Sequence, residues 1–188
     1  MLHGIRILDF SQYLPGPYAS LRLADMGAEV IKVEQLSGDP ARILGDKRDG
    51  QGLVFLANNR NKKSIAINLK EQEGQEIALQ LIKTADVVIE SFRPGVMKRL
   101  GLGYENAVEV NPTIIYCSLT GYGQETALSH FGSHDINYMA LSGVLSQLKN
   151  GQGEPIHPSI TIADLCGGMA ASEAILAALV QRSISNKG

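Results

Sequence analysis

Short apolar runs alternate along this chain with segments of helical periodicity, and this alternation most constrains the folds open to it. We expect strands at residues 5–10, 28–34, 63–68, 86–91 and 113–123, and helices at residues 18–27, 70–85, 134–148 and 164–183. The run DVVIES at 86–91 is almost wholly apolar, which is typical of a strand covered on both faces. The first strand, a loop, a helix and the second strand follow one another within about 30 residues, the length of one βαβ unit. The pattern predicts an α/β fold with a Rossmann-like, doubly wound parallel sheet.

The length of 188 residues suits a single domain with a sizeable core. Within it, residues 36–62 are polar and glycine-rich, and we expect an irregular connection there. The helix expected at 70–85 is amphipathic, with Ile77, Leu81 and Ile82 among its apolar positions.

The composition excludes several classes of partner. Hydrophobic residues make up 44% of the chain, charged residues 19%, and the net charge is −2. This balance gives no electrostatic footprint for nucleic acid or an anionic membrane. No apolar run is expected to reach membrane-spanning length, and the N-terminus lacks the basic start of a signal peptide. Because Cys117 and Cys166 have no partner at metal-ligand spacing, we expect free thiols in a cytoplasmic protein.

A dinucleotide site is a weak alternative for the first βαβ unit. Glu34 ends the second strand, where a ribose-binding carboxylate is found in such sites. The loop SQYLPGPYAS, however, has one glycine, Gly16, flanked by prolines. Without the glycine fingerprint, a pyrophosphate has no obvious seat.

Two basic clusters could hold a small anion. The first contains Arg60, Lys62 and Lys63, and the second contains Arg93, Lys98 and Arg99. Arg93 follows the carboxyl end of a buried strand, where open α/β sheets bind ligands. From composition alone, a solvated surface is the favoured interpretation of both clusters.

His134 and Asp164 each stand at the start of an expected helix, after a loop that contains glycine or proline. Taken alone, His134 could be a helix-start histidine held by a backbone group, and Asp164 a good N-cap. Together they raise the hypothesis of a site with two proton-transfer groups. A serine triad is not indicated, because no Gly-x-Ser-x-Gly elbow is present, and no His, Cys and Asp set has metal-ligand spacing.

Long ordered motifs resemble the class III CoA-transferase and α-methylacyl-CoA racemase family. They are GIRILDFSQYLPGPYASLRLADMGAEVIKVE (4–34), INLK (67–70), FRPGVMKRLGLGYE (92–105), NPTIIYCSLTGYGQ (111–124), SHDINYMALSGVL (133–145) and ADLCGGMAASEAILAAL (163–179). The HDINY and LSGVL sequences are similar to the racemase branch, whereas the transferases more often carry Gly-Tyr-Asp at Ser133-His134-Asp135. The resemblance covers residue 4 to the C-terminus.

The resemblance implies an acyl-CoA racemase that interconverts 2-methylacyl-CoA enantiomers through an enolate. His134 and Asp164 would act from opposite faces of the α-carbon, with an enolate oxygen bound by N–H groups at the start of the 165–182 helix. That chemistry needs a raised Asp164 pKa, whereas a helix N-terminus lowers it, and the sequence leaves this conflict open. One alternative is a CoA-transferase with Asp164 as nucleophile. Another is a chain that binds CoA or a partner without catalysis.

The same resemblance implies a set of CoA-binding residues and no cofactor beyond the CoA of the acyl-CoA substrate. The set comprises Asn68, Leu69, Lys70, Ser91, Phe92, Arg93, Arg99, Ser133, Asp135, Ile136, Asn137 and Tyr138. Arg93 and Arg99 are the expected phosphate contacts.

Family members form interlocked homodimers and continue into a smaller second domain, so we expect residues 1–188 to be the N-terminal Rossmann-like domain alone. Two features depart from the racemases. Gln35 stands where they usually have an arginine, and the segment 39–64 is more similar to the transferases.

Overall fold

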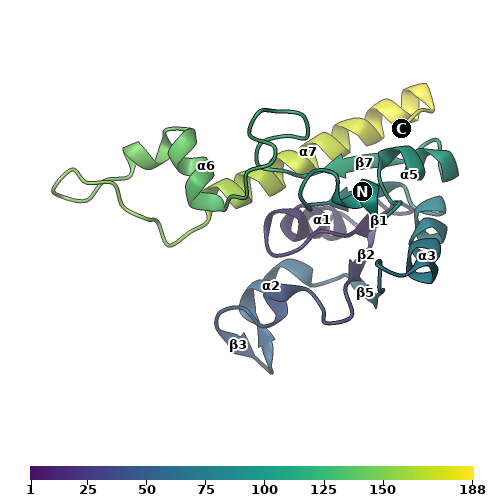
Figure 1. The fold of residues 1–188 in the computed structure, drawn as a ribbon, viewed down its shortest axis with the longest axis horizontal. Coiled ribbons are helices and arrows are strands. Elements are labelled where there is room, and N and C mark those ends of the chain that lie inside the picture. The colour runs from purple at the N-terminus through teal and green to yellow at the C-terminus, as the bar shows by residue number, and fades with distance from the viewer.

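A parallel sheet of five strands forms the centre of the molecule in the computed structural model, which describes residues 1–188 (Figure 1). The strands are β1 (Arg6–Asp9), β2 (Glu29–Glu34), β5 (Lys63–Ala66), β6 (Val87–Glu90) and β7 (Ile115–Ser118). Their order is β5-β2-β1-β6-β7, so the chain builds outward from β1 in one direction and then in the other. All strand pairs are parallel, and Ile7 of β1 lies opposite Val30 of β2 on one side and Val87 of β6 on the other. The predicted fold class is confirmed.

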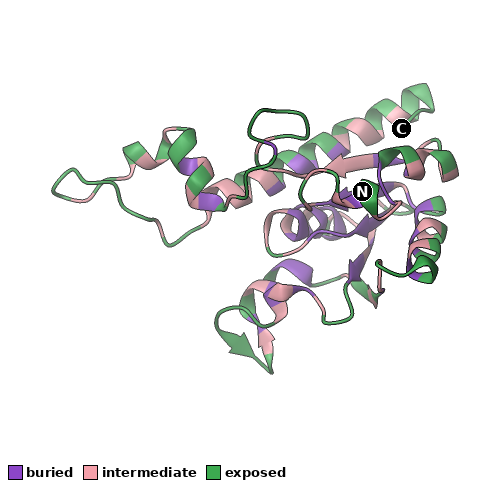
Figure 2. Cartoon of the chain, in the orientation of Figure 1, coloured by how far each residue is buried: buried purple, intermediate pink, exposed green.

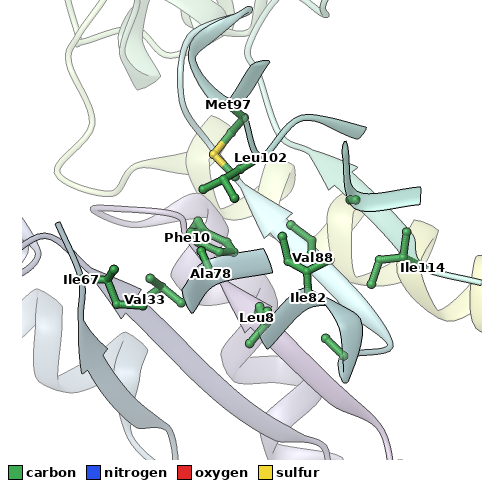
Figure 3. Packing of buried hydrophobic residues seen from close by; sticks show 12 residues of the cluster. Leu8, Phe10, Val33, Ile67, Ala78, Ile82, Val88, Met97, Leu102 and Ile114 are labelled. Atoms are coloured by element: carbon green, nitrogen blue, oxygen red, sulfur yellow. The ribbon is translucent and has the colours of Figure 1, made fainter. Parts of the chain in front are cut away.

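Helices cover both faces of the sheet. Successive side chains of a strand point to opposite faces, so a strand that is apolar throughout has an apolar side chain to bury on each face. The main helices are α1 (Pro15–Asp25), α3 (Gln72–Lys83), α5 (Tyr104–Val110) and α7 (Ile162–Ser185). On β1, Ile7 packs into a cluster with Leu23 of α1 and Ile175 of α7. Its neighbour Leu8 faces the opposite cluster, which includes Ile82 of α3. Figure 3 shows this second cluster between the strands and α3.

Residues 36–62 contain more regular structure than the sequence predicted. They form a 3-10 turn (Pro40–Arg42), a hairpin of β3 (Lys47–Arg48) and β4 (Gln51–Gly52), and the helix α2 (Leu53–Asn59). Phe55 is buried in α2, and the side chains of Asn58 and Asn59 donate to main-chain oxygens four residues earlier. The prediction of an irregular connection was therefore wrong for this segment.

Several predicted element bounds also needed correction. Helix α1 begins at Pro15, three residues earlier than expected, because proline suits the first turn of a helix. The helix expected at 134–148 is broken at Gly143, whose φ of 81° ends one helix before the next turn. The result is α6 (Asp135–Leu141) followed by a 3-10 turn (Val144–Gln147). The short helix α4 (Val96–Arg99) lies between β6 and α5.

Helix α7 has 24 residues and is long and apolar enough to cross a membrane by length and composition. The statement that no apolar run reaches that length was therefore wrong by this criterion. One such helix is weak support for a membrane span, because core helices of soluble proteins pass the same test. Here Ile175 packs in the core beside α1, while Met169, Val180 and Ile184 are exposed. Figure 2 shows that the segment around α6 extends away from the sheet and is largely exposed.

Candidate active site

A cavity of about 630 Å³ lies at the carboxyl edge of the sheet. It is lined by loops that follow β1, β6 and β7 and by the first turns of α6 and α7. The order of strands reverses between β1 and β6, and ligands of open α/β sheets bind at such a switch point. The fold therefore places this cavity where a ligand site is expected.

The cavity brings together residues that are far apart in the sequence. Of the residues named from the sequence, Ser91, Phe92, Arg93, Ser133, His134, Tyr138 and Asp164 line it. Asn68, Leu69, Lys70, Arg99, Asp135, Ile136 and Asn137 do not. The two proposed chemical groups, His134 and Asp164, thus share one cavity, as the sequence predicted.

His134 occupies the N-cap position of α6, with the extended backbone usual for a cap. Its main-chain nitrogen donates to Asn137 Oδ1 at 3.0 Å, and Asn137 nitrogen donates to the His134 carbonyl at 2.9 Å. These two hydrogen bonds fix the main chain of His134 at the cavity wall. His134 is exposed, so its ring is accessible to a ligand in the cavity.

Asp164 is the third residue of α7, which begins at Ile162. It is therefore not an N-cap, and that interpretation was wrong. The Asp164 main-chain nitrogen donates to Asp135 Oδ1 at 3.0 Å, and Leu165 nitrogen donates to the Thr161 carbonyl at 3.2 Å. The amides proposed to bind an enolate oxygen are therefore engaged, and only those of Ile162 and Ala163 remain as first-turn donors.

The Asp164 carboxyl is half-buried, and its electrostatic environment is defined by two neighbours. Burial raises its pKa, the Asp135 carboxylate raises it further, and His134 opposes the rise. The net shift is upward, because burial and Asp135 together outweigh His134. A carboxylate with a raised pKa is a stronger base and nucleophile than an ordinary aspartate.

Asp135 is 7% exposed and lies outside the cavity lining. The sequence placed it among the CoA-binding residues. In the structure it instead joins α6 to the first turn of α7 through its bond to the Asp164 amide. Its role toward Asp164 is therefore visible in the geometry, and no sequence motif indicated it.

Arg93, in the loop after β6, lines the cavity, and its guanidinium makes no ion pair or hydrogen bond within the chain. Its guanidinium lies so close to Gly132 that a Cβ at that position would collide with it. Arg99, at the end of α4, is likewise exposed and without an ion pair. The free guanidinium of Arg93 at the cavity is suited to bind an anion, and Arg99 offers a second free guanidinium outside the cavity lining.

An aromatic pair forms another part of the cavity wall. The rings of Tyr122 and Tyr138 meet edge to face with centroids 5.2 Å apart. Ser133 connects them, since its hydroxyl donates to Tyr122 Oη at 2.7 Å and its carbonyl accepts from Tyr138 Oη at 3.2 Å. Burial, Tyr122 and Asp164 raise the pKa of Tyr138, whose hydroxyl donates a hydrogen bond to the Ser133 carbonyl. Gly121 has no room for a side chain beside the Tyr138 ring.

The sequence missed several cavity residues. Gln12 and Tyr13 come from the loop after β1, and Leu119 to Tyr122 follow β7. The sequence predicted a loop after the first strand, at Pro15-Gly16-Pro17. It did not predict that this loop lies beside the loop after β6, because that depends on the order of the strands in the sheet.

Of the remaining predicted binding residues, Asn68, Leu69 and Lys70 form a turn after the edge strand β5. Asn68 Oδ1 accepts from Lys70 nitrogen at 3.2 Å, and the Leu69 carbonyl accepts from Gln75 Nε2 at 3.1 Å before α3 begins. Of the first basic cluster, Lys62 is not a solvated surface residue. Its side chain is 1% exposed and paired with Asp9.

Comparison with known proteins identifies the family. The profile of CoA-transferase family III matches residues 2–188. Succinyl-CoA:glutarate CoA-transferase of Mus musculus is 43% identical over 189 residues, covering all of this chain and 43% of that protein. Alpha-methylacyl-CoA racemase of Mus musculus is 38% identical over 189 residues, covering all of this chain and 46% of that protein.

A crystal structure of a CAIB/BAIF family protein from Brucella suis matches with a TM-score of 0.94 at 34% identity. It covers 99% of this chain and 50% of the other. Fold and cavity together define an α/β protein with a ligand site at the sheet's switch point. The chain belongs to CoA-transferase family III, which confirms the resemblance drawn from its motifs. It spans less than half the length of the curated relatives named above.

Proposed function

We propose that this chain carries the nucleophile of a CoA-transferase, and that Asp164 is that nucleophile. The observation that carries the proposal is the Asp164 carboxyl: its pKa is raised, and it lines the switch-point cavity together with the unpaired guanidinium of Arg93. The racemase interpretation led at the level of sequence. The comparisons favour transfer at least as well, because the relative with 43% identity is a succinyl-CoA:glutarate CoA-transferase.

The proposed reaction balances with the residues of the chain alone. A carboxylate oxygen of Asp164 attacks the thioester carbonyl, the C–S bond breaks, and CoA leaves as a thiolate. The thiolate then attacks the Asp164 carbonyl of the mixed anhydride and releases the first acid as a carboxylate. The acceptor carboxylate repeats these steps in reverse and departs as a new CoA thioester. No proton is consumed overall, and no cofactor beyond CoA is required.

The cavity wall supports this chemistry at two points. Arg93 would pair with a phosphate or carboxylate oxygen, since its guanidinium has no protein partner. Tyr138 carries a hydroxyl whose proton is retained and whose position is set by Ser133. It would donate to the thioester oxygen, as negative charge develops there, by giving up its hydrogen bond to the Ser133 carbonyl. Arg99 and residues 68–70 would contact more distant parts of CoA.

A racemase is the second candidate, favoured by His134 in the same cavity. In that reaction His134 and Asp164 would exchange the α-proton of a 2-methylacyl-CoA through an enolate. The raised Asp164 pKa suits the acid role as well as the nucleophilic one.

One incubation in deuterium oxide separates them. The chain is mixed with a 2-methylacyl-CoA and glutarate, and every CoA ester is weighed by mass spectrometry. A new glutaryl ester without deuterium supports transfer. A one-deuteron gain on the starting thioester, without a new ester, supports the racemase and contradicts our proposal. The matched variant Asp164→Asn is expected to abolish either signal, whereas His134→Ala is expected to abolish only deuterium exchange.

We also propose succinyl-CoA and glutarate as the first substrate pair to test. For the whole protein we propose a cytoplasmic location and an interlocked homodimer. A smaller second domain, as in the family, would complete the site. The exposed apolar residues Met169, Val180 and Ile184 of α7 support a covering partner surface. Light scattering on the purified chain measures its oligomeric state. A monomer would contradict the dimer proposal for this chain.

A further inference from the structure

Four ionised residues lie buried together behind the β1–α1 loop. They form two pairs: Lys62 with Asp9 at 3.1 Å, and Lys32 with Asp39 at 2.8 Å. Every one of these side chains is at most 2% exposed. Asp39 Oδ2 meets Lys32 Nζ outside hydrogen-bonding geometry, so this is an ionic contact rather than a directed hydrogen bond.

Stability alone is a weak explanation for such a cluster. Desolvation offsets much of the attraction in a buried ion pair, and apolar residues of similar volume are often equally stabilising. The two pairs differ in what else they hold. Lys62 Nζ donates to the Pro17 carbonyl and to Asn59 Oδ1, which ties β1 to α1 and α2.

The Lys32–Asp39 pair instead hydrogen-bonds to the main chain of the β1–α1 loop. Lys32 Nζ donates to the Ser11 carbonyl at 2.8 Å, and Asp39 Oδ1 accepts from the Tyr13 amide at 3.2 Å. Tyr13 has a φ of +64°, in the left-handed region that a residue with a side chain rarely adopts. Tyr13 is 48% exposed, so packing restrains it little. The hydrogen bond from its amide to Asp39 is the contact that restrains its main chain.

This loop is a wall of the cavity. Gln12 and Tyr13 line it together with His134 and Asp164, and the Gln12 amide donates to Ser91 Oγ at 3.2 Å on the neighbouring β6 loop. We infer that Lys32 and Asp39 are positioning residues: their buried pair clamps the Ser11–Tyr13 main chain and so sets the shape of the ligand cavity. The inference about the loop stands apart from the reaction, whereas its effect on CoA binding rests on the proposed function.

The test is a double variant, Lys32→Met with Asp39→Leu, which removes both charges and keeps apolar volume. Amide hydrogen exchange at residues 11–13 is expected to rise at least about tenfold beyond any rise in the β6 core, as for loss of one hydrogen bond to a charged group. In titration calorimetry, the Kd for CoA is expected to weaken by a similar factor. The control Arg182→Met breaks the Arg182–Asp86 pair at the opposite edge of the sheet. It is expected to change neither readout.

Unchanged exchange at residues 11–13 in the double variant overturns the inference. If exchange rises but CoA affinity is unchanged, the clamp does not shape the CoA site, and that part is contradicted. If the double variant does not fold, Asp39→Ala carries the test. It removes the Oδ1 atom that accepts from the Tyr13 amide, and exchange equal to the natural chain would again refute the clamp. Absence of CoA binding by the natural chain would instead count against the proposed function, leaving the exchange result intact.

Discussion

Asp135 Oδ1 accepts a hydrogen bond from the main-chain nitrogen of Asp164 at 3.0 Å, so one buried carboxylate orients the helix turn that carries the other. The same Asp135 carboxylate adds to the rise that burial produces in the Asp164 pKa. Positioning and electrostatic tuning of the proposed nucleophile therefore come from one side chain.

Asp135→Asn separates these two effects, because an amide oxygen can still accept from the Asp164 nitrogen. Loss of the negative charge removes one cause of the raised Asp164 pKa. We expect the pH at which Asp164 becomes reactive to fall, while the fold is retained. The check is the pH dependence of CoA-adduct formation on Asp164. A profile identical to that of the natural chain would show that Asp135 acts only as a backbone acceptor.

Gly132→Ala tests the close approach of Arg93 to the main chain. A Cβ at residue 132 meets the Arg93 guanidinium, so the arginine has to leave its place in the cavity wall. We expect the Kd for CoA to weaken by about tenfold or more, the order of one charge-assisted contact. Gly151→Ala is the matched control, since a Cβ there meets nothing within 4 Å. Equal affinities of the two variants would remove Arg93 from the proposed anion site.

Ile82→Ala and Ile77→Ala compare two positions of one helix. Ile82 is 0% exposed in the sheet-facing cluster, whereas Ile77 is 49% exposed. We expect Ile82→Ala to lower the free energy of unfolding by about 2–5 kcal/mol, and Ile77→Ala by well under about 1 kcal/mol. Urea denaturation measures both. Similar losses would mean that α3 faces the sheet differently.

The helical periodicity of residues 70–85 predicted this helix but not which isoleucine it buries. Periodicity predicts which residues form the apolar stripe of a helix. Which part of that stripe is buried depends on how the helix packs against the sheet. The strands were predictable for a related reason: the buried run around Val88 is apolar on both faces. The order of the strands was not predictable, because it depends on where each crossover connection returns to the sheet. Without that order, the sequence could not show that Gln12 and Tyr13 line the cavity.

Charged residues were the other failure of prediction. Lys62 lies in a polar stretch that looks solvated, and its partner Asp9 is 53 residues away in the sequence. The alternative interpretation of Asp164 as an N-cap rested on aspartate being a good cap ahead of a helix. The helix in fact begins two residues earlier, which places the carboxyl in the first turn and facing the cavity. The pairing of His134 with Asp164 was predictable, since both followed loops at helix starts.

Acid is expected to destabilise the fold through Asp9 and Glu34. Burial raises the Asp9 pKa, but Lys62, Lys32 and two serine hydroxyls outweigh it and hold the pKa well below the usual range. Burial likewise opposes the shift at Glu34, where Arg42, Ser64 and the Asp39 amide lower the pKa to about 2.

Both folded-state pKa values lie below those of the unfolded chain, so the stabilisation is complete above about pH 5 and is lost as pH falls toward the folded values. Glu34→Gln is expected to cost about 1–3 kcal/mol near neutral pH, since Arg42 is partly exposed. Urea unfolding at several pH values should show this deficit shrinking as the pH is lowered through that window. A deficit that does not change with pH would contradict the lowered pKa of Glu34.

The central claim is that Asp164 becomes covalently attached to the CoA thioester, and peptide mass spectrometry tests it most directly. The chain is incubated with succinyl-CoA without acceptor, quenched in acid and digested, and the peptide that contains Asp164 is weighed. We predict an added acyl or CoA group on Asp164, absent from Asp164→Asn and present in His134→Ala. An unmodified Asp164 peptide, in a sample that exchanges the α-proton of a 2-methylacyl-CoA for deuterium, would contradict the account and establish the two-base reaction instead.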